Sequence, residues 1–194
     1  MHLIPSLKIG VWNAWLFMSV FLIQMIAILF ADKHIREKTH VPAIARGNRF
    51  ERYSGFFGNF VWLLAMGYSV FLPLQFNTIW FYIGLSVFLI GLILIVIATF
   101  NFINTSADQL INKGVYRFSR HPMYLATFFI CQGSGIASGS LLFVFLSLIM
   151  AFCFHYEALI EERYCLEKYS SAYKEYMNSV PRWIGISRRM SDSK

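Results

Sequence analysis

Charged side chains are missing from three long stretches of this sequence. Lys, Arg, Asp and Glu are absent from residues 9 to 31, 53 to 107 and 121 to 156. Only 14% of the 194 residues are charged, 57% are hydrophobic, and the mean hydropathy is +0.54. These values exclude an ordinary soluble domain and indicate a chain that folds in a lipid bilayer.

Cysteines are few, and nucleotide-binding motifs are absent. The three cysteines are Cys131, Cys153 and Cys165. An odd number without CxxC spacing argues against a disulfide framework and a zinc site, so we expect no metal. Without GxGxxG or GxxxxGK, a soluble nucleotide-binding domain is not expected. The net charge of +7 does not indicate nucleic acid, because the basic residues collect at the ends of apolar segments.

The first two uncharged stretches predict three membrane crossings. A helix needs roughly 20 apolar residues to cross a bilayer. Residues 9 to 31 are long enough for one such helix. Pro73 marks a turn that divides the second stretch into residues 54 to 72 and 78 to 100.

Glycines and serines interrupt the third stretch. The run between residues 133 and 140 separates a short helix that starts at Pro122 from a longer one that starts at Leu141. The short helix either crosses fully or ends within the bilayer. The expected fold is all-α: a polytopic integral membrane protein with five transmembrane segments and an amphipathic C-terminal helix.

Basic residues predict the orientation. Lys8 is the only one of seventeen Lys and Arg before the first segment, and the other sixteen lie in residues 32 to 52, 108 to 120 and after 156. The positive-inside rule places these three regions in the cytosol and the N-terminus outside. Lys8 alone is a weak signal-peptide n-region and no clear cleavage site follows, so the first segment is expected to be a retained span.

The two halves of the chain differ in polarity. Residues 1 to 100 suggest a three-span scaffold without a buried ionisable group, with a solvated loop at residues 32 to 52. Residues 101 to 194 combine two membrane helices with a cytosolic loop and tail, and we expect them to be the functional half of a single structural domain. After Glu167, tyrosines at helical spacing predict an amphipathic helix that ends at Pro181 and either caps the bundle or lies on the bilayer.

Basic residues cluster just before the short helix. Pro122 is suited to the first helical position, and the free N–H groups of the first turn form an anion site beside Arg120 and His121. A carboxylate or phosphate is the natural ligand of such a site. In the alternative interpretation, Arg117 and Arg120 are ordinary membrane anchors and His121 is a helix cap.

Glutamates mark the point where the last membrane helix leaves the bilayer. Glu157 and Glu161 share one helical face, and Glu162 lies about a hundred degrees around the helix. Carboxylates at the membrane edge need cationic partners. Those partners are either Arg163 and the basic loops, or a cationic ligand.

The order and spacing of these features resemble the isoprenylcysteine carboxyl methyltransferase family over residues 100 to 184. The shared elements are Gly114-Val115-Tyr116, Arg120-His121-Pro122-x-Tyr124, Glu161-Glu162, a tyrosine-rich helix and Val180-Pro181-Arg182. Membrane phospholipid methyltransferases share much of this pattern. The resemblance implies a compact microbial enzyme that transfers a methyl group from S-adenosylmethionine to a prenylated cysteine or similar lipophilic acceptor and releases S-adenosylhomocysteine.

The resemblance also implies a set of site residues. Those that would contact the cofactor are Gln109, Leu110, Ile111, Tyr116, His121, Pro122, Met123, Tyr124, Glu161 and Glu162. Arg120 and Glu161 would be the catalytic residues, which position the reactants without forming a covalent intermediate. A helix N-terminus with His121 suits a cofactor carboxylate, and a glutamate suits its ammonium group. Larger relatives have an arginine where this chain has Glu157, which leaves the acceptor open.

Three alternatives remain at this point. A phospholipid amine acceptor requires a base, for which Glu157 or Glu161 is suited. An NADPH-dependent enzyme resembling sterol reductases would share the Arg-His-Pro-x-Tyr segment, but paired glutamates suit a 2′-phosphate poorly. A protein of the same fold could also bind membrane lipid without catalysis.

Overall fold

The computed structural model describes residues 1–30, 47–106 and 108–185 and is helical throughout its regular elements. The elements are α1 (Trp15–Leu29), α4 (Arg49–Ser69), α5 (Ile79–Ile103), the short 3-10 helix η1 (Gly114–Arg117), α6 (Pro122–Ala137) and α7 (Leu141–Ser179). Only two isolated β-bridges occur among the described residues. The predicted all-α class is therefore confirmed.

Polar side chains at the N-caps define where three of these helices begin. Asn48 forms a capping box with Glu51 at the start of α4, and the hydroxyls of Thr78 and Ser140 accept hydrogen bonds at the starts of α5 and α7. Helix α4 thus begins at Arg49, five residues before the predicted segment. The beginning of α6 at Pro122 is as predicted.

The first helix is shorter than the uncharged stretch that predicted it. Residues before Trp15 are not helical, because the Asn13 amide donates to the carbonyls of Lys8 and Val70 at 2.6 Å each and fixes an irregular segment. Helix α1 therefore starts at Trp15 rather than Ile9. Ala31, the predicted end of this segment, lies outside the described residues.

The prediction of a break at residues 133 to 135 is wrong. Helix α6 continues through these residues to Ala137, and the turn is confined to Ser138–Ser140. The glycines instead let α5 and α6 approach closely. A Cβ atom on Gly84 would lie 2.2 Å from the Ala137 nitrogen, and one on Gly133 would lie 2.5 Å from the Phe88 nitrogen. A sequence pattern typical of a turn is here the contact surface between two helices.

Two helices have the length and composition of a membrane span. They are α5, with 25 residues, and α7, with 39. Helix α1, with 15 residues, is apolar but shorter than the roughly 20 residues that a perpendicular crossing needs. The structure thus supports two candidate spans among the described residues. It does not confirm all five predicted segments as helices long and apolar enough to cross a membrane.

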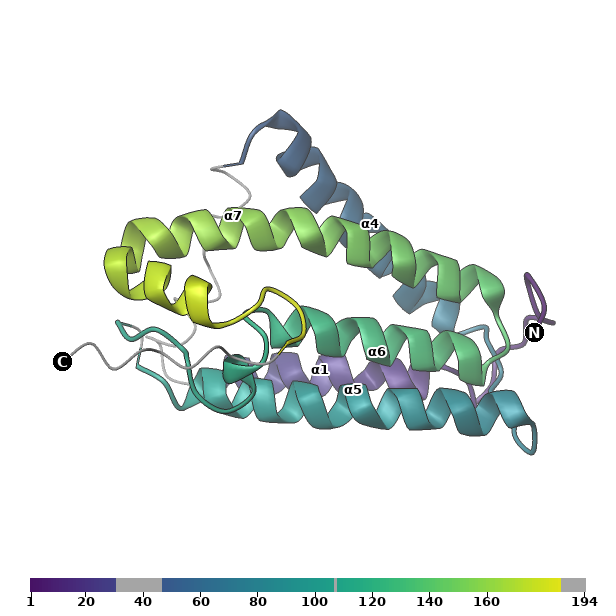
Figure 1. Cartoon of the computed structure of the whole chain (residues 1–194). Helices are drawn as coiled ribbons and strands as arrows, with labels where there is room; N and C mark the ends of the chain where they lie inside the picture. Colours follow the sequence, from purple (N-terminus) through teal and green to yellow (C-terminus); the bar gives the residue numbers. More distant parts are fainter. Residues whose placement is uncertain (31–46, 107, 186–194) are drawn as a thin grey trace.

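The chain turns of the bundle gather at two ends. At one end, His2 exchanges backbone hydrogen bonds with Gly139 and Leu141, and the Gln75 amide donates to the Ala137 carbonyl at 2.9 Å. Figure 1 shows the N-terminus beside the α6–α7 connection at this end. The end of α5, η1 and the start of α6 lie at the other end, so residues 108 to 122 approach the C-terminal half of α7.

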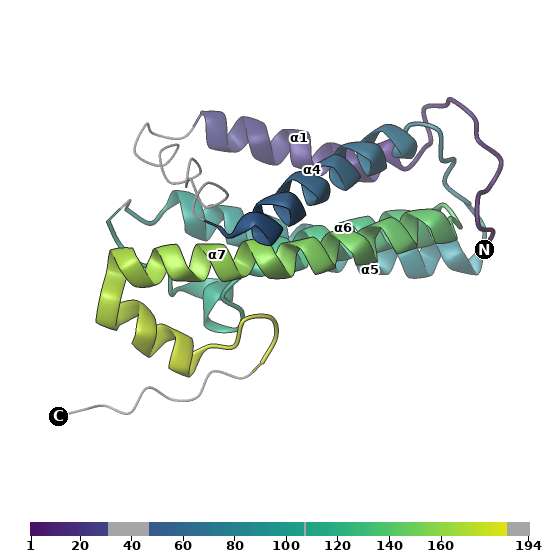
Figure 2. The same cartoon turned by 90° about the horizontal axis from the view of Figure 1, so that it is seen from above.

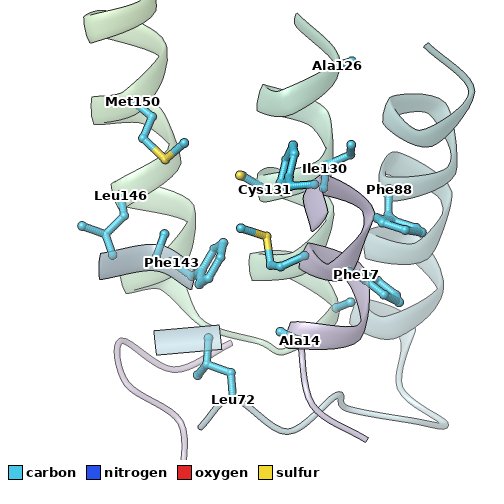
Figure 3. Packing of buried hydrophobic residues seen from close by; sticks show 14 of the residues in the cluster. Ala14, Phe17, Leu72, Phe88, Ala126, Ile130, Cys131, Phe143, Leu146 and Met150 are labelled. Atoms are coloured by element: carbon cyan, nitrogen blue, oxygen red, sulfur yellow. The ribbon is translucent and has the colours of Figure 1, made fainter. Parts of the chain in front are cut away.

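One apolar cluster joins the five α-helices of the described residues. In Figure 3, Phe143, Leu146 and Met150 of α7 face Ile130 and Cys131 of α6, while Phe17 of α1 lies against Phe88 of α5. The rings of Phe17 and Phe88 are stacked with their centroids 4.1 Å apart. Figure 2 shows that α4 crosses α7 obliquely and lies beside α1. This packing fixes α6 and α7, which carry most of the polar residues described below.

Helix α7 bends back on itself near its end. Ser170 has φ of 47° and ψ of −117°, so the last helical residues reverse direction toward the start of α6 (Figure 1). Tyr173 and Tyr176 are buried in a second cluster with Val180 and Leu110. The predicted tyrosine helix is thus the returning part of α7, and it packs on the protein.

The region predicted as a solvated loop contains a buried acid. Glu51 is only 5% exposed and accepts a hydrogen bond of 2.6 Å from Arg163 of α7. This ion pair ties α4 to α7, which the sequence interpretation of residues 32 to 52 did not anticipate. Residues 32 to 46 of that predicted loop lie outside the described residues.

Candidate active site

A short C-terminal segment completes a polar cluster at the start of α6. We call residues 180–185, which follow α7, the C-terminal strap. The Arg120 amide donates to the Pro181 carbonyl at 3.1 Å, the Ser119 hydroxyl donates to the Arg182 carbonyl at 3.1 Å, and the Gly185 amide donates to the Phe118 carbonyl at 3.3 Å. These bonds hold the strap against the residues just before α6.

The carboxylate of Glu162 is the centre of the cluster. Arg182 donates to both of its oxygens, from Nε and Nη2, at 2.8 Å each. His121 Nε2 lies 3.2 Å and Arg120 Nη2 3.4 Å from the same Oε1 atom. The side chain of Glu162 is only 4% exposed. Three cationic or polar partners thus compensate the burial of one carboxylate.

His121 joins the two predicted glutamates. Its Nδ1 lies 3.3 Å from Glu161 Oε2, while its Nε2 faces Glu162. The ring makes no capping hydrogen bond to α6. The alternative in which the His121 side chain caps the helix is therefore wrong. Burial lowers the pKa of His121, but hydrogen bonds to Glu161 and Glu162 and their negative charges outweigh it, so the pKa is raised above its ordinary value.

Glu161 is the accessible carboxylate of the pair. Its side chain is 39% exposed, in contrast to Glu162, and the Tyr124 hydroxyl donates to its Oε1 atom at 2.5 Å. The Tyr124 ring is stacked between His121, at 5.7 Å, and Phe154, at 4.9 Å. Tyr124 therefore connects the polar cluster to the apolar side chains of α7.

Arg120 has unused hydrogen-bonding capacity. Its side chain is 9% exposed, and its Nε and Nη1 atoms are buried with no hydrogen-bond partner in the described part of the chain. Buried guanidinium donors without partners are costly. The arrangement fits an anionic group that accepts from Arg120.

The remaining predicted residues lie around η1 and the loop before it. Tyr116 is buried, its carbonyl accepts a hydrogen bond of 2.6 Å from the Tyr176 hydroxyl, and burial raises the pKa of its own phenol. Leu110 packs on the tyrosine cluster, and the Gln109 carbonyl accepts from Tyr169 at 3.4 Å. The described structure gives Ile111 no specific role, and the loop contacts the returning part of α7.

Pro122 and Met123 form the first turn of α6. Pro122 is fully buried, and Met123 packs on the main apolar cluster. These two residues support the position of His121 and Tyr124, because they anchor the helix start in the core. Their side chains have no polar atom to offer a charged ligand.

An apolar cavity of about 220 Å³ opens beside Tyr124. It is lined by Tyr124, Leu125, Phe128, Ala151, Phe154, His155 and Trp183. The Trp183 ring, which belongs to the C-terminal strap, lies 6.1 Å from the ring of His121 and 6.3 Å from that of His155. The polar cluster and the cavity therefore share a wall.

Sequence reasoning missed three residues of this region. Arg182 occurs in the motif that carries the resemblance, but nothing in its spacing shows that it pairs with Glu162. His155 and Trp183 belong to no pattern that singles them out in the sequence. The signal that could have found Arg182 is the need of a buried carboxylate for a cation near the end of the tyrosine helix.

The fold and this site define a helical membrane protein with a polar site at one end of its bundle. Residues 62–172 match the phospholipid methyltransferase family. The match covers more than half of the chain, from α4 to just beyond the bend in α7. The chain belongs to this family. Curated proteins and solved structures give no match.

Family membership refines the resemblance seen in the sequence. The matching family is the phospholipid methyltransferases, which belong to the same membrane methyltransferase superfamily as the isoprenylcysteine carboxyl methyltransferases. It indicates an S-adenosylmethionine-dependent membrane methyltransferase, since family members typically use this cofactor. The isoprenylcysteine-specific assignment is not what the family match supports.

Proposed function

We propose that this protein methylates a lipid acceptor whose apolar part occupies the cavity beside Tyr124, with S-adenosylmethionine held at the polar cluster. The observation that carries the proposal is the wall that the apolar cavity shares with the polar cluster. Arg120 has buried donors without partners on one side, and an apolar cavity lies on the other. This arrangement suits a reaction between a charged cofactor and a lipophilic acceptor.

The polar cluster has side chains that fit the charged groups of the cofactor. The unpartnered Nε and Nη1 atoms of Arg120 suit its carboxylate, and the half-exposed carboxylate of Glu161 suits its ammonium group. The loop at Gln109–Ile111 and the aromatic residues Tyr116 and Tyr124 are proposed to line the remainder. When bound, the cofactor supplies an electrophilic methyl group on its sulfonium.

Glu162 and His121 are proposed to hold the site in shape. Because Glu162 already has Arg182, His121 and Arg120 around it, its charge fixes the positions of Arg120 and His121. Pro122 and Met123 anchor the helix from which Tyr124 extends. Arg120 and Glu161 remain the proposed catalytic residues, since they are the ones with capacity to contact reactants.

We propose an amine as the acceptor group. Glu161 and Glu157, one turn apart on α7, attract an ammonium and repel a carboxylate. A phospholipid with an amino headgroup satisfies this charge and agrees with the family. Carboxyl methylation of a prenylated cysteine is the second candidate. The free donors of Arg120 favour it, because they could orient an acceptor carboxylate.

The site is proposed to face the cytosol. Basic residues of the sequence collect in the regions that include the loop before α6 and the segment after residue 156. We propose five membrane segments with the N-terminus outside, in which the shorter helices are accommodated by local thinning of the bilayer or by partial insertion. Residues 1 to 100 would then be scaffold and residues 101 to 194 the catalytic half.

Calorimetric titration of the purified protein and a methyl-transfer assay test this function. We expect binding of S-adenosylmethionine and S-adenosylhomocysteine but not of NADPH, and methyl transfer to amino phospholipids in vesicles. Transfer only to prenylcysteines would establish the second candidate. Binding of NADPH alone would show a reductase, and binding of lipid without either cofactor would show a non-catalytic protein.

A further inference from the structure

The apolar cavity contains one ionisable side chain whose polar atoms are not engaged. We infer that His155 accepts the proton that an amino lipid releases before its nitrogen is methylated. This inference rests on the proposed function, because only an amine acceptor has a proton to lose. It assigns a catalytic role to a residue outside the polar cluster.

His155 lies where a headgroup nitrogen would meet the polar cluster. It lines the cavity together with Tyr124 and Trp183. Its half-buried ring contacts Trp183 at 6.3 Å and Tyr156 at 5.6 Å between centroids. No hydrogen bond engages its ring nitrogens within the described residues. A lipid whose chains fill the apolar part of the cavity would bring its headgroup to this residue.

The other candidate bases at the site are engaged. Glu161 accepts from Tyr124 at one oxygen and faces His121 Nδ1 with the other. Both ring nitrogens of His121 face carboxylates, and Glu162 is bound by Arg182. Glu157 does not line the cavity.

Tyr124 reaches the cavity but is also unsuited as the base. Its hydroxyl already donates its proton to Glu161. His155 is therefore the residue that combines access to the cavity with a free ring nitrogen among the described residues.

The chemistry of the acceptor requires such a group. Alkyl amines, like the lysine side chain, hold their proton up to a pH of about 10, and the protonated nitrogen has no lone pair. Transfer of that proton to a ring nitrogen of His155 leaves a neutral amine. Its lone pair forms the new nitrogen–carbon bond as the methyl–sulfur bond breaks, giving a methylated ammonium and a thioether. The imidazolium then returns its proton to water.

The groups around His155 determine how readily it takes up the proton. Tyr124 of α6 and Tyr156 of α7 are its titratable neighbours, and Phe50 of α4 packs on Tyr156. Trp183 also contacts the ring of His121, and Tyr124 connects the cavity wall to Glu161.

The test compares His155→Gln with Phe128→Leu, which changes the same cavity without removing an ionisable group. Methyl transfer to phosphatidylethanolamine vesicles is measured from pH 6 to about 10, together with S-adenosylhomocysteine affinity. For His155→Gln we expect kcat at pH 7 to fall by about 10²- to 10⁴-fold, with the deficit shrinking as the pH approaches the pKa of the amine itself. Cofactor affinity should stay unchanged, and Phe128→Leu should keep the wild-type pH profile.

Two further measurements guard against a folding defect. His155→Ala should regain part of its activity when imidazole is added. In the unmodified protein, dodecylamine should protect His155 from carbethoxylation by diethylpyrocarbonate, as mapped by mass spectrometry. This second readout does not depend on turnover.

The outcomes separate this inference from the function on which it rests. If the wild type methylates the amino lipid while His155→Gln stays within about threefold of it at pH 7, with the same pH profile, His155 is not the base. The same conclusion follows if dodecylamine leaves carbethoxylation of His155 unchanged. If the wild type methylates no amine at all, the proposed acceptor is wrong and the inference falls with it.

Discussion

Arg182 and Glu162 form a two-point contact in which Nε and Nη2 each lie 2.8 Å from a different carboxylate oxygen. The two residues come from the strap and from α7, on either side of the bend at Ser170. Because Glu162 also faces Arg120 and His121, this contact connects the end of the described chain to the start of α6.

Replacing Arg182 tests the importance of that contact for stability. Arg182→Ala leaves a buried carboxylate short of its principal partner and should lower the free energy of unfolding by about 1.5 to 3 kcal/mol. Arg182→Lys keeps the charge but loses the second hydrogen bond, so its loss should be smaller. Thermal unfolding in detergent measures both. Equal stability of all three proteins would show that the pair contributes nothing.

The two accessible glutamates of α7 are predicted to differ in cofactor binding. Glu161→Gln should lower the affinity for S-adenosylhomocysteine by about one to two decades, because a lost charge-assisted hydrogen bond costs about 1.5 to 3 kcal/mol. Glu157→Gln, one turn earlier, is the control and should leave this affinity nearly unchanged. Glu162→Gln should also weaken binding, through displacement of Arg120. Titration calorimetry measures these affinities. If Glu161→Gln and Glu162→Gln both bind S-adenosylhomocysteine within twofold of the wild type, the two glutamates do not belong to the cofactor site.

His121 predicts a pH dependence of stability. Its pKa is higher in the folded protein than the unfolded value of about 6.5. The charged ring therefore contributes stability that is fully present below the unfolded pKa and is lost as the pH rises through the folded pKa. The melting temperature of the wild type, relative to that of His121→Asn, should fall with rising pH in that window. A pH-independent difference would contradict the ion pairing.

His121→Asn also separates the two interpretations of this residue. Asn is among the best N-caps, so a capping role would be preserved. Since the His121 ring contacts Glu161 and Glu162 instead, we expect the variant to bind S-adenosylmethionine more weakly, and Arg120→Ala to act in the same direction. Calorimetry measures the affinity for S-adenosylmethionine, and thermal melting of the apoprotein controls for stability. If the affinity equals that of the wild type, His121 does not belong to the cofactor site.

The close contact of α5 and α6 predicts the effect of an added methyl group. Gly84→Ala would place its Cβ against the backbone of Ala137, which cannot move aside as a side chain could, and should cost about 1 to 3 kcal/mol of stability. Gly67→Ala is the matched control, because a Cβ there meets nothing within 4 Å. It should be neutral or slightly stabilising. Comparable melting temperatures for the two variants would refute the packing argument.

Cysteine labelling tests the proposed orientation. A cysteine introduced at Gln75 lies at the end of the bundle with His2 and Ala137 and should react with impermeant reagents only from outside the cell. A cysteine at Lys113, in the loop before η1, should react only from the cytosol. Labelling at Gln75 from the cytosolic side alone would reverse the model of the membrane topology.

Features of the fold that depend on local chemistry could be predicted from the sequence. Contacts between helices mostly could not. Pro122 marked a helix start correctly, and the charge-free stretches located α5 and α7, because these signals act within a few residues. Gly133 was interpreted as part of a turn, although it contacts α5. A glycine that bends the backbone and a glycine that admits another helix are identical in sequence, so only the neighbour Phe88 distinguishes them.

The same difference between local sequence signals and long-range contacts applies to the candidate site. Motif spacing indicated His121, Tyr124, Glu161 and Glu162, and the structure places all four in contact through hydrogen bonds and ion pairs. Motif spacing did not indicate that Arg182 pairs with Glu162, because this pairing depends on the reversal of the chain at Ser170, which no helix pattern contains. Long-range pairing of this kind requires the path of the backbone.

The bend at Ser170 also separates two partners along the chain. Arg182 is synthesised after Glu162, so the glutamate gains the cation that binds both of its oxygens only once the chain has continued past the bend. A chain interrupted between the two would keep its apolar helices but carry an uncompensated acid at its centre. The strap is therefore the last part of the polar cluster to be supplied, and a product without it would differ from the longer chain in the charge balance around Glu162.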